Sequence, residues 1–230
     1  MMRHSPPTLS KWQRDRTSLF VKICGIRDAV TARVCADAGA DAIGVVYASG
    51  SCRAVSANEA TQIAAGFDLT DLVVGVFRNA PIDDPNLRGH AGALQFHGGE
   101  TESFIAQNTR SGRLIVKAIG TDLAALTAWD SSASIDALLV DADDPGAGLA
   151  HSTAWLERVG ALVPTLRKPL ILAGGLTPST VADAIRIVRP AGVDVSSGVE
   201  SSRGIKDPGL IREFIQAARS AHAQDRKSVV

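Results

Sequence analysis

The chain has 230 residues, which at roughly 150 residues per domain corresponds to one large domain or two small ones. Lys plus Arg and Asp plus Glu are 24 each, so the formal net charge is zero, and no basic stripe of the kind that binds nucleic acid is present. No run approaches the ~18 apolar residues that cross a membrane, and the basic N-terminal segment lacks the apolar core of an export signal. We therefore expect a cytoplasmic α/β protein, with no nucleic-acid or membrane partner, that acts on a small polar or anionic metabolite.

The two ends of the chain show no hydrophobic period. Residues 1–18 carry four basic side chains and two adjacent prolines, and they are interpreted as a flexible N-terminal arm. Residues 221–230 (AHAQDRKSVV) are interpreted as a flexible C-terminal tail. The organised domain is expected to span residues 19–220.

Eight short apolar runs rich in Val, Leu and Ile recur through this domain. Their hydrophobicity is continuous rather than alternating, which is typical of parallel strands buried on both faces. The predicted strands are 20–23, 42–47, 72–77, 93–96, 114–119, 137–141, 170–174 and 193–197.

Helix signals lie between several of these runs. Residues 28–38 place Val30, Val34 and Ala38 on one predicted inner face, and Gly39 follows as a C-terminal cap. Thr177-Pro178 opens a helix lined by Ala182, Ile185 and Val188, and Asp207-Pro208 opens the last, with Leu210, Ile211, Phe214 and Ile215 inward. The Pro- and Asp-rich segment 80–89 predicts only a weak helix.

The dipeptide Ala-Gly precedes three even-numbered strands, at 38–39, 91–92 and 191–192. We interpret it as a helix that stops in the left-handed conformation at glycine and turns directly into a strand. Eight strands at about 25 residues per strand–helix unit predict a single (β/α)8 barrel, with a doubly wound open sheet as the alternative.

In a barrel, function is expected at the carboxyl ends of the strands. Polar and titratable residues follow most of the predicted strands: Cys24, Cys52-Arg53, His97, Asp141 with Asp143 and Asp144, Gly174-Gly175, and Ser197-Gly198. Small residues let backbone N–H groups approach an anion, so the paired loops after strands seven and eight predict a phosphate site at Gly174, Gly175, Ser197 and Gly198. Tight turns that need glycine are the alternative explanation.

Seven segments, in order, resemble phosphoribosylanthranilate isomerase, a family of tryptophan biosynthesis. They are residues 21–25 (VKICG), 39–44 (GADAIG), 51–56 (SCRAVS), 95–98 (QFHG), 173–176 (AGGL), 193–200 (VDVSSGVE) and 204–207 (GIKD). The resemblance implies an Amadori rearrangement of N-(5-phosphoribosyl)anthranilate to 1-(2-carboxyphenylamino)-1-deoxyribulose 5-phosphate. It implies no metal and no cofactor, a phosphoribosyl substrate, and possible association with other tryptophan-pathway enzymes.

The resemblance also assigns catalytic roles to two residues. Cys24 matches the general base and Asp141 the general acid, and the strand-end position of each points the same way. A small buried thiol is the alternative for Cys24 and the expectation for Cys35, whereas Cys52 is interpreted as incidental. Asp143 and Asp144 compete with Asp141 but lie further into the loop.

Three further residues are expected to contact the substrate. Arg53 matches an arginine for the anthranilate carboxylate, which a guanidinium can bind with two hydrogen bonds, and His97 is expected to line the site. Gly148 lies in a glycine turn after Asp141. The segment 145–155 (PGAGLAHSTAW) departs from the family pattern, with Pro for the first Gly, Ala for a hydroxyl residue and a longer run to Trp155.

Two alternatives remain open from the residues. One is a related phosphosugar isomerase of the histidine-pathway or dual-specificity type, which would place an Asp where this chain has Cys24. The other is a non-catalytic paralogue that binds a phosphoribosyl ligand, against which the presence of both Cys24 and Asp141 argues.

Overall fold

Eight parallel strands form a closed barrel in the computed structural model of this chain, in the order β1 to β8. The structure describes residues 18–67, 72–108, 113–141 and 151–227. The strands are β1 (Phe20–Cys24), β2 (Ala42–Val46), β3 (Val73–Phe77), β4 (Leu94–Phe96), β5 (Ile115–Ile119), β6 (Ala137–Val140), β7 (Leu170–Leu172) and β8 (Gly192–Val195). The prediction of eight strands and of a barrel is confirmed, and the open-sheet alternative is wrong because β8 pairs with β1.

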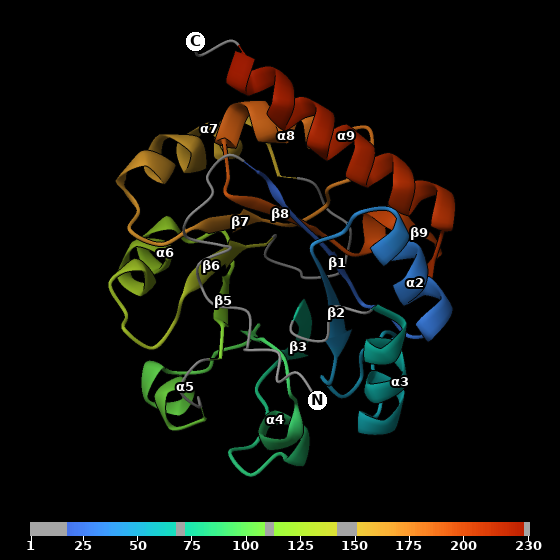
Figure 1. Cartoon of the computed structure of the whole chain (residues 1–230). Helices are drawn as coiled ribbons and strands as arrows, with labels where there is room; N and C mark the ends of the chain where they lie inside the picture. The colour runs from blue at the N-terminus through green and yellow to red at the C-terminus, as the bar shows by residue number, and fades with distance from the viewer. Residues whose placement is uncertain (1–17, 68–71, 109–112, 142–150, 228–230) are drawn as a thin grey trace, which may run out of the picture.

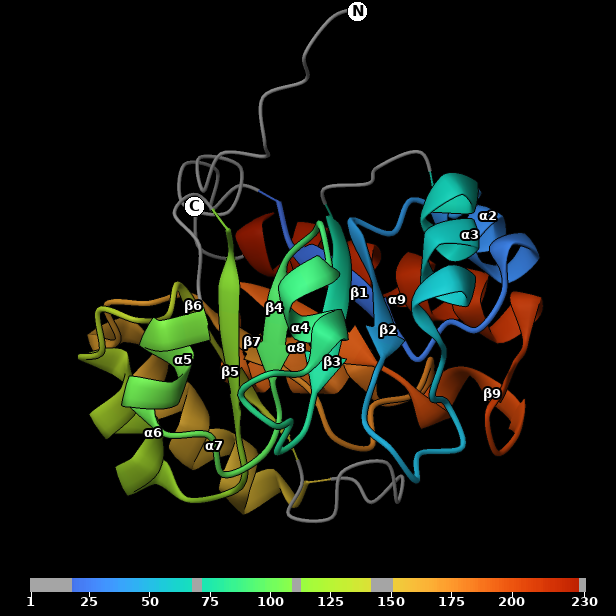
Figure 2. The same ribbon diagram turned by 90° about the horizontal axis from the view of Figure 1, so that it is seen from below.

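Helices surround the barrel (Figure 1). They are α2 (Ala29–Asp37), α3 (Ala57–Phe67), α4 (Pro85–Gly89), α5 (Glu102–Asn108), α6 (Leu123–Asp130), α7 (Thr153–Leu162), α8 (Val181–Val188) and α9 (Pro208–Lys227). A short antiparallel hairpin, β9 (Glu200–Ser202) with β10 (Ile205–Lys206), precedes α9. Figure 2 shows the same arrangement turned by 90° and seen from below, with α2 and α3 at the right, α5, α6 and α7 at the left and β9 at the lower right.

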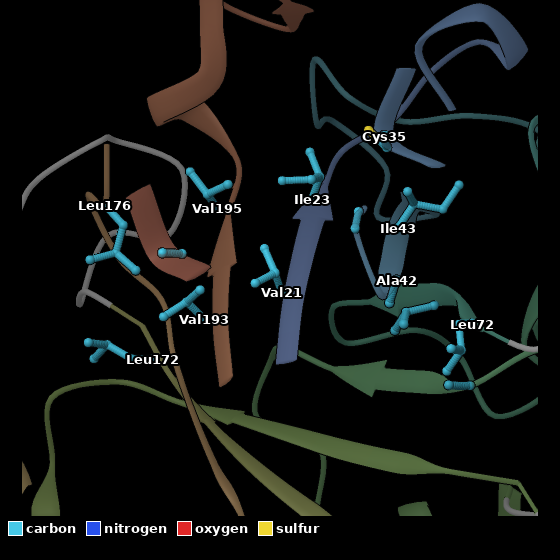
Figure 3. Packing of buried hydrophobic residues seen from close by; sticks show 14 of the residues in the cluster. Val21, Ile23, Cys35, Ala42, Ile43, Leu72, Leu172, Leu176, Val193 and Val195 are labelled. Carbon is cyan, nitrogen blue, oxygen red and sulfur yellow. The ribbon is translucent and has the colours of Figure 1, made fainter. Parts of the chain in front are cut away.

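Alternate residues of each strand face the helices and the barrel interior. In β1, Val21 and Ile23 belong to the cluster between strands and helices, together with Cys35 of α2 (Figure 3). Lys22 and Cys24 occupy the other face of β1, where Cys24 packs against Val46. The barrel interior therefore carries a lysine and a cysteine at β1.

The predicted inner face of α2 is wrong at Val30 and right at Val34 and Ala38, which are partly buried against the core. Val30 is 77% exposed, whereas Ala32 and Cys35 are fully buried. Small side chains fill this face because α2 and α3 approach closely: a Cβ on Gly66 would lie 2.5 Å from the carbonyl oxygen of Ala29. The expectation that Cys35 is a buried thiol is confirmed, and burial raises its pKa to about 12.

The interpretation of the Ala-Gly pairs holds for one of three positions. Gly39 has φ +87°, as a left-handed cap requires. Gly92 and Gly192 are not left-handed; a Cβ on them would lie 2.1 Å from the Val73 oxygen and 2.9 Å from the Phe20 oxygen. These two glycines permit close approach of neighbouring strands, while α8 ends in a left-handed arginine instead.

The helix openings are partly as predicted. The Asp207 carboxylate accepts hydrogen bonds from the N–H groups of Gly209 and Leu210 and so caps α9. The predicted opening at Thr177-Pro178 is a turn, and α8 itself begins at Val181. Its fully buried residues are Val181, Ala184, Ile185 and Val188, and Ala182 packs, partly buried, against the same core, so the expected inner side is confirmed.

The last helix is longer than expected. The sequence places the end of the organised domain at residue 220, whereas α9 continues to Lys227 and Ala221 is buried. The alanines of this segment are good helix formers, and they extend the surface of α9 that covers α8, α2 and β1. Among the described residues, no helix is long and apolar enough to cross a membrane.

Candidate active site

Cys24 is the last residue of β1 and is 8% exposed. Gly25 and Ile26 donate backbone hydrogen bonds to the Gly44 oxygen, both at 2.9 Å, which draws the end of β1 against β2. A Cβ on Gly44 would lie 2.7 Å from the Cys24 sulfur, so this glycine leaves the space that the thiol occupies. Burial raises the pKa of Cys24, while the neighbouring cations Lys22 and Lys206 oppose that effect.

Lys22 and Asp194 form an ion pair inside the barrel. The Lys22 Nζ lies 2.7 Å from the Asp194 Oδ2, and the two residues are paired in register across β1 and β8. Burial alone lowers the pKa of Lys22, but the Asp194 carboxylate and the Cys24 side chain outweigh burial and raise it. The sequence analysis did not single out this pair; the signal was a charged residue within each of two continuous apolar runs.

Asp141 directly follows β6 and faces His97, which directly follows β4. The Asp141 amide donates to the Ile119 oxygen and the His97 amide to the Phe77 oxygen, so both residues extend the barrel ladder by one position. The His97 Nε2 lies 3.3 Å from the Asp141 Oδ2, and the His97 Nδ1 lies 3.1 Å from the Gln95 amide nitrogen. These contacts bring two of the predicted site residues together on one rim.

A buried carboxylate fixes the loop that carries His97. Glu100 accepts hydrogen bonds from the N–H groups of Asn79 and Gly98 and pairs with Lys117, whose Nζ also donates to the Gly98 oxygen. Lys117 further lies over the ring of Trp129 at 5.6 Å from its centroid. The network explains why a polar loop keeps one shape beside Asp141.

Arg53 is 8% exposed and forms an ion pair with Glu200 through two hydrogen bonds. The Arg53 Nε and Nη2 donate to the two Glu200 oxygens at 2.7 and 2.8 Å. Because this contact occupies one edge of the guanidinium, Nη1 is the nitrogen that no described residue binds. The predicted carboxylate contact of Arg53 would therefore use its remaining edge.

Lys206 connects the Arg53–Glu200 ion pair to Cys24. Its Nζ donates to Glu200 at 2.8 Å and to the Ser196 oxygen at 2.8 Å, and the Ser196 hydroxyl donates to the Cys24 oxygen at 3.2 Å. Burial alone would raise the pKa of Glu200, but the hydrogen bonds from Arg53 and Lys206 lower it to about 2. The sequence analysis missed these roles of Glu200 and Lys206, although both lie within the quoted motif segments.

The loops after β7 and β8 touch each other. Gly174 and Gly175 have φ +86° and +63°, and a Cβ on Gly198 would lie 1.8 Å from the Leu176 oxygen. Ser197 begins a short 3-10 helix that ends at Val199. The glycines thus serve tight turns and close loop contact, and Gly174, Gly175, Ser197 and Gly198 are partly exposed.

The remaining residues singled out in the sequence lie outside the described part of the chain or away from these contacts. Gly148, with the competing acids Asp143 and Asp144, lies outside the described residues. Cys52 is a partly exposed free cysteine that lies beside Gly204. Within the described ranges, no group of three or more His, Cys, Asp or Glu side chains could hold a metal ion.

The chain matches the family model described as N-(5'-phosphoribosyl)anthranilate isomerase over residues 21–217. A protein of this name from Paracoccus denitrificans is 41% identical over 216 residues, covering 87% of this chain and 97% of the relative. The protein of this name from Pseudomonas fluorescens is 42% identical over 217 residues, covering 86% and 97%.

Solved structures give the same result. The phosphoribosyl anthranilate isomerase of Thermotoga maritima matches with a TM-score of 0.77 and 33% identity, covering 88% of this chain and 99% of that one. A second structure of such an isomerase, in complex with reduced 1-(o-carboxyphenylamino)-1-deoxyribulose 5-phosphate, matches with a TM-score of 0.73 and 32% identity, with the same coverage.

Proposed function

Because this chain belongs to the N-(5'-phosphoribosyl)anthranilate isomerase family, we propose that it converts N-(5-phosphoribosyl)anthranilate into 1-(2-carboxyphenylamino)-1-deoxyribulose 5-phosphate in tryptophan biosynthesis. The observation that carries the proposal is the position of a thiol and a carboxyl, Cys24 and Asp141, at the ends of two strands of one parallel barrel. Parallel strands open on the same rim, where a small substrate can reach both groups.

The proposed reaction is an internal redox isomerisation that needs two proton transfers. Asp141 gives a proton to the ribose ring oxygen, the bond from C1 to that oxygen breaks, and a Schiff base forms. Cys24, as thiolate, then takes the proton from C2, and the resulting enolamine rearranges to the aminoketose. General acid and base steps of this kind typically contribute about 10²–10⁴-fold each.

Binding is assigned to the groups around this pair. The guanidinium of Arg53 holds the anthranilate carboxylate, His97 lines the site beside Asp141, and Gly148 provides a further substrate contact. The phosphate is bound by backbone N–H groups of Gly174, Gly175, Ser197 and Gly198. The positive φ of Gly174 and Gly175 and the close contact of Gly198 with the Leu176 oxygen, at two loops that touch each other, support this placement.

Turnover of freshly prepared substrate tests the proposal. We expect the purified protein to consume N-(5-phosphoribosyl)anthranilate and release the aminoketose, and its gene to restore growth without tryptophan in cells that lack this isomerase. A non-catalytic paralogue would bind the product analogue without turnover. A related phosphosugar isomerase of the histidine-pathway or dual-specificity type would instead turn over a different phosphoribosyl substrate in preference to this one.

A further inference from the structure

We propose that Lys22 is a positioning residue for the base: its ammonium, fixed by Asp194 inside the barrel, stabilises the thiolate form of Cys24. The inference rests on the proposed function for its catalytic meaning. Its physical content, the ionisation of one thiol, can be measured without substrate.

The strand geometry sets the two side chains together. Lys22 and Cys24 are two residues apart on β1, so both project from the same face of the strand, away from Val21 and Ile23. Asp194 lies opposite Lys22 on β8, and its carboxylate holds the Lys22 Nζ at 2.7 Å. The ammonium is thereby fixed within reach of the sulfur, and the two groups influence each other's ionisation.

The pair is poorly suited to a purely structural role. Burying two charges costs several kcal/mol per ion unless their hydrogen bonds are complete. The Asp194 Oδ1 is buried and has no hydrogen-bond partner among the described residues, and Asp194 is 6% exposed. The buried ion pair of Lys117 and Glu100 is better satisfied, because both oxygens of Glu100 accept backbone N–H groups besides Lys117.

The charged side chains around Cys24 favour its negatively charged thiolate form. Three cations face Cys24 or its immediate partners: Lys22 from β1, Lys206 from β10, and Arg53 from the loop after β2. Two carboxylates oppose them, Asp194 from β8 and Glu200 from β9. The cluster carries one excess positive charge while Cys24 is a thiol, and it becomes neutral when Cys24 ionises. Burial disfavours the thiolate, and Lys22 is the cation that shares its strand and its face.

The test is a titration of the thiol by its ultraviolet thiolate absorbance, with the Cys24→Ser spectrum subtracted. We expect Lys22→Met to move the ionisation of Cys24 to higher pH by one unit or more, which means at least about tenfold less thiolate below the midpoint. The acidic limb of kcat/KM should move by the same amount, with activity recovering at high pH. Lys22→Arg, which keeps the charge, should titrate near the wild type.

Lys117→Met is the matched control. It removes another buried lysine of a carboxylate pair, on β5, and should leave the Cys24 titration in place.

An unmoved Cys24 titration in folded Lys22→Met would overturn the proposal. If Lys22→Met does not fold, the same comparison is made with Lys22→Gln. A shifted thiol titration in a protein that never turns over the substrate would count against the proposed function and leave the role of Lys22 intact. Turnover by the wild type together with an unmoved thiol titration in Lys22→Met would support the proposed function and overturn the role of Lys22.

Discussion

Individual side chains at the rim are held in place by neighbouring residues. Gly44 makes room for the Cys24 sulfur, Gln95 and Glu100 orient His97 and its loop, and Glu200 fixes Arg53. Such preorganisation means that the reacting groups need little rearrangement when substrate arrives.

Replacing either proposed catalytic group should remove chemistry and spare binding. We expect Cys24→Ser and Asp141→Asn each to lower kcat/KM by about 10²–10⁴-fold or more, because a hydroxyl is a far poorer base and an amide carries no acidic proton. Affinity for the reduced product analogue should stay close to wild type. Steady-state kinetics and calorimetry give both values, with Cys35→Ala as the control thiol, and a folded Cys24→Ser enzyme within about tenfold of wild type would exclude Cys24 as the base.

Arg53 should contribute to affinity through charge-assisted hydrogen bonds. Arg53→Ala is expected to weaken binding of the product analogue by about 1.5–3 kcal/mol, and Arg53→Lys to restore only part, since lysine lacks the planar fork. Titration calorimetry measures both, and Arg88, an exposed arginine at the end of α4, provides the control Arg88→Ala. Unchanged affinity in Arg53→Ala would remove it from the binding site.

Among the secondary-structure elements, the loops after β7 and β8 depend on each other. A methyl group on Gly198 would overlap the Leu176 oxygen, so Gly198→Ala should push the loops apart and raise KM strongly, while strand packing survives. Gly39→Ala is the control: its φ is +87° but nothing lies within 4 Å of the added methyl, so only backbone strain of about 1–2 kcal/mol is expected. Steady-state kinetics and thermal unfolding separate the two outcomes, and an unchanged KM in Gly198→Ala would argue against phosphate at these loops.

The hairpin of β9 and β10 is tied to the barrel by a carboxylate that titrates in acid. The pKa of Glu200 is about 2 in the folded chain and near 4.5 ordinarily, so its contribution to stability is complete above about pH 4.5 and is lost as the pH falls towards 2. At about 1.4 kcal/mol per pKa unit, the contribution is about 3 kcal/mol or less. Glu200→Gln should therefore be less stable than wild type at neutral pH, and the gap should narrow in acid, as urea unfolding at several pH values would reveal; an equal gap at pH 3 and pH 7 would contradict this role.

Strands were predictable from the sequence and helix faces were less so. Continuous apolar runs admit one placement in a buried sheet, and all eight were located. In α2, by contrast, the bulky residue Val30 points to solvent and the small residues Ala32 and Cys35 pack inward, because close helix contact selects for size as well as for apolarity.

The candidate site was predictable where one residue acts alone at a strand end. Cys24, His97 and Asp141 could be placed from local sequence because each directly follows a strand or ends it. The pairs Lys22–Asp194 and Arg53–Glu200 join residues more than 140 positions apart, and only barrel closure brings them together. Partner choice at this distance is a tertiary property that no local pattern encodes.

The whole molecule depends on α9 to close the ring of helices. This helix contacts α8, α2 and β1, so it bridges the last and first strand–helix units where the chain begins and ends the barrel (Figure 1). Phe214 and Ile211 supply buried side chains for this closure.

Shortening a buried side chain of α9 should lower the free energy of unfolding of the entire barrel. Phe214→Ala is expected to lower the free energy of unfolding by about 3–5 kcal/mol, the range for a fully buried phenylalanine. Val30→Ala, at a side chain that is 77% exposed, should change it by about 0.5 kcal/mol or less. Denaturant unfolding measures both; equal effects would show that α9 does not contribute to the cooperative core.

The contact between Gly44 and the sulfur of Cys24 also restricts how this sequence can diverge. An alanine at position 44 would place its methyl carbon 2.7 Å from the sulfur, closer than real side chains come, so the two positions cannot change independently. A mutational path that enlarges residue 44 must first pass through a smaller atom at residue 24, and with it through loss of the proposed base. Selection for the reaction would therefore keep glycine at position 44, because the Cys24 sulfur on the neighbouring strand needs the space.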